Sequence, residues 1–235
     1  MMNKLDSKQR IICALDFENM DLAVNLIEKI EAYIQWYKIG MELFTKEGPS
    51  AVETVTKRGS SVFLDLKYHD IPATVEKAIM SAANLGVSLL TVHACGGEEM
   101  LEACSRARDR IKNAPAILAV TVLTSLDRGD LRKIGIQSSP EDQVLRMGQL
   151  AKEAGLDGVV ASPMEVASLR KELGEEMLIV TPGVRLDSES QNDHARAHTP
   201  RHAIEDGADY IVVGRPIRNA KNPADIAQKY ISSIS

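Results

Sequence analysis

The sequence predicts a single-domain (β/α)8 barrel (TIM barrel) of the α/β class, covering residues 1–235. Eight short apolar runs alternate with amphipathic stretches along the chain, as in repeated β–α–β units. The runs are continuously apolar, which indicates strands buried on both faces of a parallel sheet. The length suits one barrel, and no linker or low-complexity segment divides the chain.

The expected strands are rich in Ile, Val and Leu and alternate with stretches of helical periodicity. Strands are predicted over residues 10–16, 36–40, 62–67, 88–94, 116–123, 157–162, 177–182 and 209–214. Helices are predicted over residues 21–32, 49–58, 72–85, 97–112, 141–154, 163–173 and 217–232, with a short one over 199–206. A doubly wound open sheet is the alternative, but neither G-x-G-x-x-G nor G-x-x-x-x-G-K-[ST] follows any predicted strand.

Two connections, about 124–140 and about 183–199, are longer than barrel loops need. Both follow predicted strands, so both are expected over the C-terminal face, where barrel enzymes place their sites. Loops of this length are usually functional or disordered. Their position favours a functional role.

Composition argues against several kinds of partner. The formal net charge is -5 and no Lys/Arg tract occurs, so nucleic acid is not an expected partner. No apolar run approaches membrane-spanning length, and the N-terminus lacks the order of a signal peptide. Cys13, Cys95 and Cys104 fit no zinc or C-x-x-C spacing. We expect a cytoplasmic protein with reduced thiols and no membrane partner.

Charged residues gather near the C-terminal ends of the first three predicted strands. Asp65 and Lys67 stand at i and i+2 in "VFLDLK", so their side chains share one face of a strand. Asp16 ends the first strand, and Lys38 lies near the end of the second. An Asp–Lys pair about 4 Å apart attracts by roughly 4 kcal/mol at an effective dielectric near 20. We interpret the Asp65–Lys67 pair as functional, because an ordinary barrel strand is apolar at such positions.

The other charged residues have structural alternatives. Asp16 could cap a helix, and Lys38 could extend its ammonium group to the surface. Asp70 is a good N-cap candidate, with Pro72 in the first turn of the following helix. For Asp70 alone, the residues favour the cap.

The ends of the last two strands offer groups that bind anions. Gly214 in "VVGRPI" lets a ligand approach the backbone, and Arg215 adds a cationic fork at a helix start. Arg185 in "TPGVR" supplies a second guanidinium. Barrel enzymes often bind phosphate after strands 7 and 8; the structural alternative is a plain turn with a solvated arginine.

Three histidines, His194, His198 and His202, recur every fourth residue. On one helix they would share a face, but Pro200 disfavours a continuous helix. No carboxylate-rich ligand pattern accompanies them at the strand ends. We therefore expect no metal site.

Several longer motifs resemble the bacterial orotidine 5'-monophosphate decarboxylase family. They are "ALDF", "YKIGMELF", "FLDLKYHDIPATV", "VHACGG", "VTVLTS", "TPGVR" and "VVGRPI", in order from residue 14 to 217. The D-x-K-x-x-D core is shared with related barrels, including 3-keto-gulonate-phosphate decarboxylase and hexulose-phosphate synthase. The fuller "DLKYHDIPATV", with "KIGMELF" and "LTS", points more narrowly to the first family.

The resemblance implies a cofactor-independent and metal-independent decarboxylase that converts orotidine 5'-monophosphate to UMP and CO2 in pyrimidine biosynthesis. It also implies a homodimer with shared active sites, a lid over about 124–140 and a phosphate loop over about 183–199. Lys67 would protonate C6 within an alternating catalytic network. The catalytic positions implied are Lys38, Asp65, Lys67 and Asp70. The substrate-binding positions implied are Asp16, Lys38, Ile71, Thr74, Thr124, Ser125, Pro182, Arg185, His194, Gly214 and Arg215.

Three points stay open at this stage. The family usually has a phosphate-binding glutamine where this chain has His194, so either His194 or Gln191 could take that contact. The nearest alternative activity is that of a related sugar-phosphate decarboxylase or lyase. A barrel that binds nucleotides without turnover is the third possibility.

Overall fold

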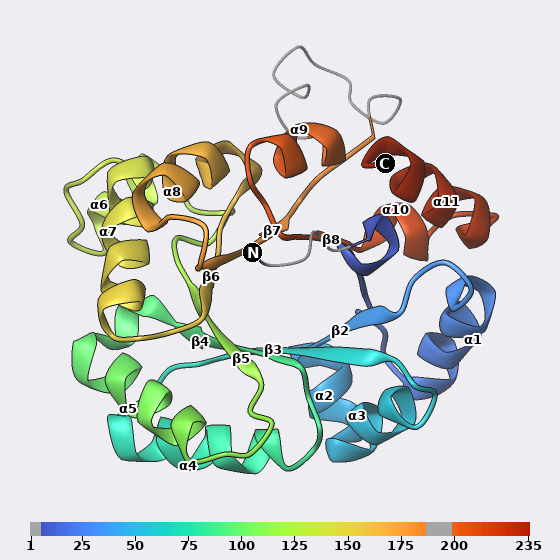
Figure 1. The fold of residues 1–235 in the computed structure, drawn as a ribbon, viewed down its shortest axis with the longest axis horizontal. Coiled ribbons are helices and arrows are strands. Elements are labelled where there is room, and N and C mark those ends of the chain that lie inside the picture. Colours follow the sequence, from blue (N-terminus) through green and yellow to red (C-terminus); the bar gives the residue numbers. More distant parts are fainter. Residues whose placement is uncertain (1–5, 187–198) are drawn as a thin grey trace.

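The computed structural model describes residues 6–186 and 199–235, and its eight parallel strands close into a barrel (Figure 1). The strands are β1 (Ile11–Ala14), β2 (Trp36–Gly40), β3 (Ser61–Tyr68), β4 (Leu89–His93), β5 (Ala116–Val120), β6 (Gly158–Val160), β7 (Leu178–Pro182) and β8 (Tyr210–Val213). Each strand pairs with its neighbours in sequence, and β8 closes the barrel against β1 with Ile211 opposite Ile11. The predicted (β/α)8 fold is confirmed.

Helices form a ring outside the strands (Figure 1). They are α1 (Met20–Ile30), α2 (Met41–Glu47), α3 (Pro49–Thr56), α4 (Pro72–Ala83), α5 (Glu98–Asp109), α6 (Arg128–Lys133), α7 (Pro140–Glu153), α8 (Val166–Leu173), α9 (Pro200–Glu205), α10 (Arg215–Arg218) and α11 (Pro223–Ser233). Short 3-10 turns cover Ser7–Gln9, Ala94–Gly96 and Pro163–Glu165. Within the described ranges, none of these helices has the length and apolarity to cross a membrane.

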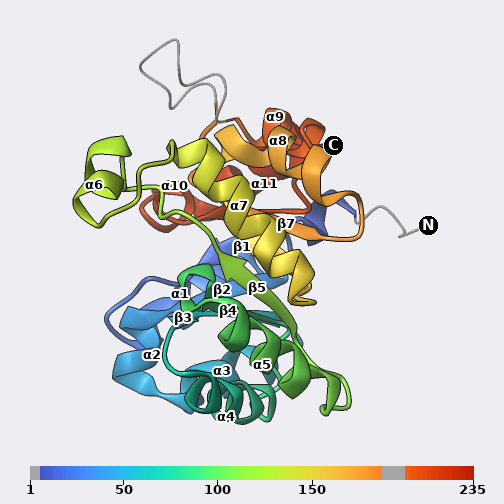
Figure 2. The ribbon, with the colours of Figure 1, turned by 90° about the vertical axis from the view of Figure 1, so that its left-hand side faces the viewer.

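The helical prediction was wrong in three places. It missed α2, which directly follows β2. The connection 124–140 contains α6, whose start carries a capping box in which Asp127 accepts from the amide of Asp130 at 2.9 Å. In Figure 2, α6 projects to the left of the barrel. The predicted helix 217–232 is two helices, α10 and α11. Pro223, which has no amide hydrogen, begins the second of them.

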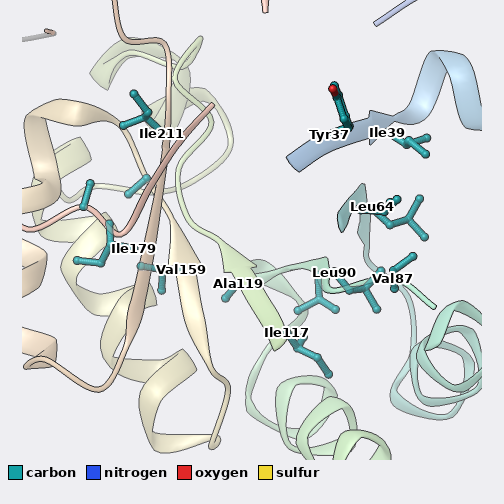
Figure 3. Packing of buried hydrophobic residues seen from close by; sticks show 14 of the residues in the cluster. Tyr37, Ile39, Leu64, Val87, Leu90, Ile117, Ala119, Val159, Ile179 and Ile211 are labelled. Atoms are coloured by element: carbon teal, nitrogen blue, oxygen red, sulfur yellow. The ribbon is translucent and has the colours of Figure 1, made fainter. Parts of the chain in front are cut away.

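Alternate side chains of the strands build two separate cores. The outer core lies between barrel and helices and includes Tyr37, Ile39, Leu64 and Ile117 (Figure 3). The inner core fills the barrel with Ile12, Ala14, Phe63, Leu89, Leu118, Val180, Tyr210 and Val212. Burial on both faces explains why the strand sequences are continuously apolar.

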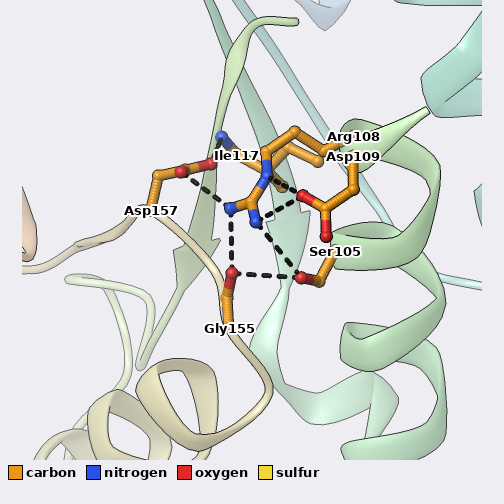
Figure 4. Close-up of polar contacts among 6 residues, drawn as sticks. All are labelled: Ser105, Arg108, Asp109, Ile117, Gly155 and Asp157. Atoms are coloured by element: carbon orange, nitrogen blue, oxygen red, sulfur yellow. Dashed lines mark hydrogen bonds and ion pairs between the residues drawn. The ribbon is translucent and has the colours of Figure 1, made fainter. Parts of the chain in front are cut away.

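Arginine clamps fix the starts of the strands at the opposite end from the charged residues. Arg108 of α5 donates to Asp157 Oδ1 at 2.7 Å, and Asp157 Oδ2 accepts from the amide of Ile117 at 2.7 Å (Figure 4). The same arrangement recurs where Arg170 meets Asp209, which accepts from the amide of Ile179. Hydrogen bonds to charged groups contribute about 1.5–3 kcal/mol each. These contacts stabilise the N-terminal face of the barrel. A functional site is therefore expected at the C-terminal face.

Candidate functional site

A chain of alternating charges lies at the C-terminal ends of β1, β2 and β3. Lys38 Nζ is 3.0 Å from Asp16 Oδ1 and 3.5 Å from Asp65 Oδ2. Asp65 Oδ1 is in turn 2.8 Å from Lys67 Nζ. The structure therefore brings together four of the residues predicted from the sequence.

Strand geometry aims these side chains into the barrel. Lys38 follows the inward-facing Trp36 by two residues, and Asp65 follows the inward-facing Phe63 by two. Gly40 leaves room for the pair formed by Lys38 and Asp16. A Cβ at this glycine would lie 2.9 Å from Lys38 Nζ and 3.1 Å from Asp16 Oδ1. The surface alternative for Lys38 does not hold, because its side chain is only 12% exposed.

The carboxylate of Asp65 is buried but stays ionised. Burial by itself would raise the pKa of Asp65, yet the neighbouring Lys38 and Lys67 ammonium groups outweigh it and lower this pKa. Hydrogen bonds from Lys67 and from the hydroxyl of Thr91 act in the same direction. The site thus holds an anion between two cations in a partly dry environment.

Lys67 has an unusual backbone conformation. Its φ is 52°, in the left-handed region, which costs an L-residue about 1–2 kcal/mol. The register between β3 and β4 shifts between Leu64 and Tyr68, so a bulge lies under this lysine. Strain of this kind persists where the surrounding structure enforces it, and it is typical of functional sites.

A pocket of about 210 Å³ opens beside this charged chain. Lys38, Asp65 and Lys67 line one side of it. The remaining lining residues are Phe63, Val120, Val122, Leu123, Thr124, Val160, Ala161, Pro182 and Val212. An apolar pocket with a few convergent charges suits a small molecule with a flat apolar part and a charged substituent.

The predicted residues after β3 lie outside this pocket. Asp70, Ile71 and Thr74 are exposed, and Asp70 makes no ion pair within the described part of the chain. The N-cap interpretation of Asp70 was wrong: Ile71 is the N-cap of α4, since Pro72 already occupies the first helical position. The Asp70 carboxylate instead accepts from the amide of Ile71 at 2.7 Å.

The residues predicted to bind phosphate lie near the C-terminal ends of β7 and β8. Pro182 lines the pocket, and a Cβ on Gly214 would lie 3.8 Å from Asp16 Oδ2, which places this glycine at the same mouth. Arg185 donates to the carbonyl of Val184 at 3.2 Å. Arg215 begins α10, as expected, but is exposed and lines a separate surface hollow on α10 and α11.

The predicted lid, about 124–140, lies within the described residues, whereas most of the predicted phosphate loop, about 183–199, does not. Thr124 lines the pocket, and its neighbour Ser125 is exposed at the start of the connection that carries α6. His194 and Gln191 fall outside the described residues, so the choice between them stays a prediction. Among residues 6–186 and 199–235, no group of three or more His, Cys, Asp and Glu side chains could hold a metal ion.

Two polar residues at the site, Thr91 and Arg218, were not predicted from the sequence. Thr91 faces inward on β4 and touches both Asp65 and Lys67; its position two residues after the inward-facing Leu89 was the available signal. Arg218 of α10 donates to the backbone carbonyl of Asp16, and its guanidinium lies 5.7 Å from the centre of the Phe17 ring. No sequence pattern indicates that second contact, which joins residues far apart in the chain.

Fold and site together define a (β/α)8 barrel with a Lys–Asp–Lys centre built to bind and transform an anionic small molecule. Comparison with known proteins narrows this class. A sequence model of the orotidine 5'-phosphate decarboxylase / HUMPS family matches residues 9–230. The chain belongs to this family.

Individual relatives agree over almost the full chain. The orotidine 5'-phosphate decarboxylase of Trichlorobacter lovleyi is 45% identical over 236 residues, which cover 99% of this chain and 98% of that protein. The Vibrio cholerae serotype O1 protein of the same name is 46% identical over 226 residues, covering 96% and 98%. The crystal structure of orotidine 5'-phosphate decarboxylase from Lactobacillus acidophilus superposes with a TM-score of 0.85 at 35% identity, covering 97% of this chain and 99% of that one.

Proposed function

We propose that this protein decarboxylates orotidine 5'-monophosphate to UMP and CO2 in pyrimidine biosynthesis, with Lys67 as the proton donor to C6. The observation that carries the proposal is the Lys38–Asp65–Lys67 chain, with both its lysines beside an apolar pocket. The names of the relatives point to the same substrate and reaction.

The charges of the site fit the electron flow of this reaction. Breaking the bond between C6 and the carboxylate releases CO2 and leaves the bonding electron pair on C6. An ammonium group next to C6 stabilises that negative charge and then supplies the proton that gives UMP. Asp65 lies beside the departing carboxylate and raises the energy of the bound substrate by repulsion. Its contact with Lys67, at 2.8 Å, holds the ammonium group in place.

Other predicted residues have binding roles in this proposal. Asp16 and Lys38 hold the ribose, and Thr124 and Ser125 contact the pyrimidine edge. Gly214 and Arg215 hold the phosphate together with Arg185, and the loop 183–199 supplies a further contact through His194 or Gln191. Binding energy from the phosphate, which lies far from C6, can stabilise closure of the lid 124–140 and exclude water.

We also propose a homodimer in which each site uses residues of both subunits. Asp70, Ile71 and Thr74 are exposed at the start of α4, and the Ile71 side chain is 66% exposed. The resemblance to the family places these three residues at the subunit interface, and their exposure leaves them accessible to a second chain. Asp70 of one subunit would then complete the charge chain of its partner.

We propose that the protein is cytoplasmic, because its cysteines are unpaired. Cys13, Cys95 and Cys104 are all free in the structure. Proteins of oxidising compartments more often pair their cysteines.

A sugar-phosphate decarboxylase or lyase is the second candidate, because the matching family model spans both groups of barrels. Its relatives commonly use a divalent metal, whereas the proposed reaction needs none. The purified protein is expected to convert orotidine 5'-monophosphate to UMP at the same rate before and after treatment with EDTA. The measurement is the loss of substrate absorbance, with UMP identified chromatographically. Absence of UMP would refute the proposal, and loss of the rate with EDTA would refute metal independence.

A further inference from the structure

We propose that Thr91 is a positioning residue for the decarboxylation: its hydroxyl holds the Asp65 carboxylate and the backbone of Lys67 in their working geometry. The proposal rests on the proposed function for its kinetic consequences. Its structural basis is independent of the substrate, because every contact involved lies within the described chain.

Thr91 stands opposite an irregularity in the sheet. Leu64 pairs with Leu90 and Tyr68 pairs with Val92, so the three residues 65–67 of β3 face Thr91 alone on β4. In a regular parallel sheet, the amide of Lys67 would donate to a backbone carbonyl on a neighbouring strand. The bulge removes that option for Lys67, whose amide donates instead to Thr91 Oγ1 at 2.9 Å.

The same hydroxyl also acts on the carboxylate. Thr91 Oγ1 donates to Asp65 Oδ1 at 3.0 Å, and this oxygen also accepts from Lys67 Nζ at 2.8 Å. A hydroxyl has one hydrogen to donate and lone pairs that accept, so it satisfies both bonds at once. Thr91 is fully buried, which excludes water as an equivalent replacement. One side chain therefore fixes both partners of the Asp65–Lys67 pair.

The two hydrogen bonds of Thr91 offset two free-energy costs, the backbone strain at Lys67 and the burial of the Asp65 carboxylate. Lys67 is held at a φ of 52°, which an L-residue leaves unless its surroundings enforce it. Asp65 is buried, and a buried carboxylate needs donors as well as neighbouring cations. Charged groups facing Asp65 are Lys38 from β2 and Lys67 from its own strand, while β4 contributes the neutral Thr91. Thr91 thus supports the anion without adding charge that would compete for the lysines.

The test compares Thr91→Val, which keeps the shape and removes the hydroxyl, with Thr91→Ser, which keeps the hydroxyl. Thr91→Val is expected to lower kcat by about 10- to 100-fold, as for loss of a hydrogen bond to a charged group, with little change in KM. The acid limb of kcat/KM should move to higher pH, because Asp65 loses a donor that favours its ionised form. Thr91→Ser should restore both properties.

Thr181→Val is the matched control. Thr181 is as fully buried as Thr91 and lies on β7, but its Oγ1 has no hydrogen-bond partner among the described residues. This variant should keep the wild-type kcat and pH profile. If Thr91→Val fails to fold, as judged by circular dichroism, Thr91→Ala replaces it in the comparison with Thr91→Ser. Equal losses in the valine (or alanine) and serine variants of Thr91 would overturn the proposal, because the hydroxyl would then be irrelevant.

A second readout needs no activity. The pKa of Asp65, followed by carbon-13 NMR of its carboxyl carbon and assigned with Asp65→Asn, is expected to rise in Thr91→Val and to return in Thr91→Ser. An unchanged pKa together with wild-type kcat in Thr91→Val would overturn the positioning role. If the wild-type protein fails to produce UMP, the proposed function falls. The titration then still decides whether Thr91 holds Asp65.

Discussion

Lys67→Ala is expected to lower kcat by at least about 10⁴-fold while the protein stays folded. The substitution removes both the cation that stabilises the carbanion and the proton that quenches it. Each tenfold loss corresponds to about 1.4 kcal/mol of barrier. Lys67 lines the pocket and its side chain is only 26% exposed, so a solvent molecule does not easily take its place. The measurement is kcat with orotidine 5'-monophosphate, alongside circular dichroism and binding of UMP.

Lys57→Ala is the control for this experiment. Lys57 directly follows α3 and forms an ion pair with Glu53 of that helix. Its side chain is 75% exposed, so its loss should leave kcat unchanged. A folded Lys67→Ala protein with wild-type kcat would mean that another group protonates C6.

Mixed dimers of Lys67→Ala and Asp70→Ala subunits are expected to regain activity that neither parent has. In a shared site, Lys67 comes from one subunit and Asp70 from the other, so each mixed dimer contains one undamaged site. Random exchange gives about a quarter of the wild-type sites, and kcat should recover to about that fraction. The measurement is kcat of the mixture, with mixed dimers quantified through two different affinity tags.

A mixture of Lys67→Ala and Asp65→Asn subunits is the control. Asp65 and Lys67 pair within one chain at 2.8 Å, so every site in this mixture lacks one of them. It should stay inactive. If the first mixture also stays inactive although mixed dimers have formed, Asp70 does not act across the interface.

The fold could be predicted from the sequence because its main signals are local. Continuous apolar runs mark strands that are buried on both faces, and all eight strands begin within one residue of their predicted starts. The missed helices α2 and α6 have only seven and six residues, and α6 depends on the capping box of Asp127 and Asp130. Such short helices carry too little periodicity to stand out.

The site was predictable where it depends on strand alternation and less so where it depends on tertiary geometry. The inward positions of Lys38 and Asp65 follow from the two-residue period of a strand. The bulge under Lys67 depends on the register between β3 and β4, which the sequence of β3 alone does not specify. Thr91 gains its role only through that register. Asp70 was wrongly predicted as the N-cap, because Pro72 could occupy the first or the second position of the helix. It occupies the first, so the N-cap is Ile71.

A crystal structure of the protein with bound UMP would test whether Lys67 is the group that protonates C6. We expect the pyrimidine ring in the pocket lined by Phe63, Val160 and Pro182, with C6 within about 3–3.5 Å of Lys67 Nζ, as proton transfer requires. The phosphate should lie at the ends of β7 and β8, and Asp70 of the partner subunit should lie next to Lys67. A nucleotide bound with C6 turned away from Lys67, or with its phosphate at the Lys67 end of the pocket, would show that Lys67 is not the proton donor.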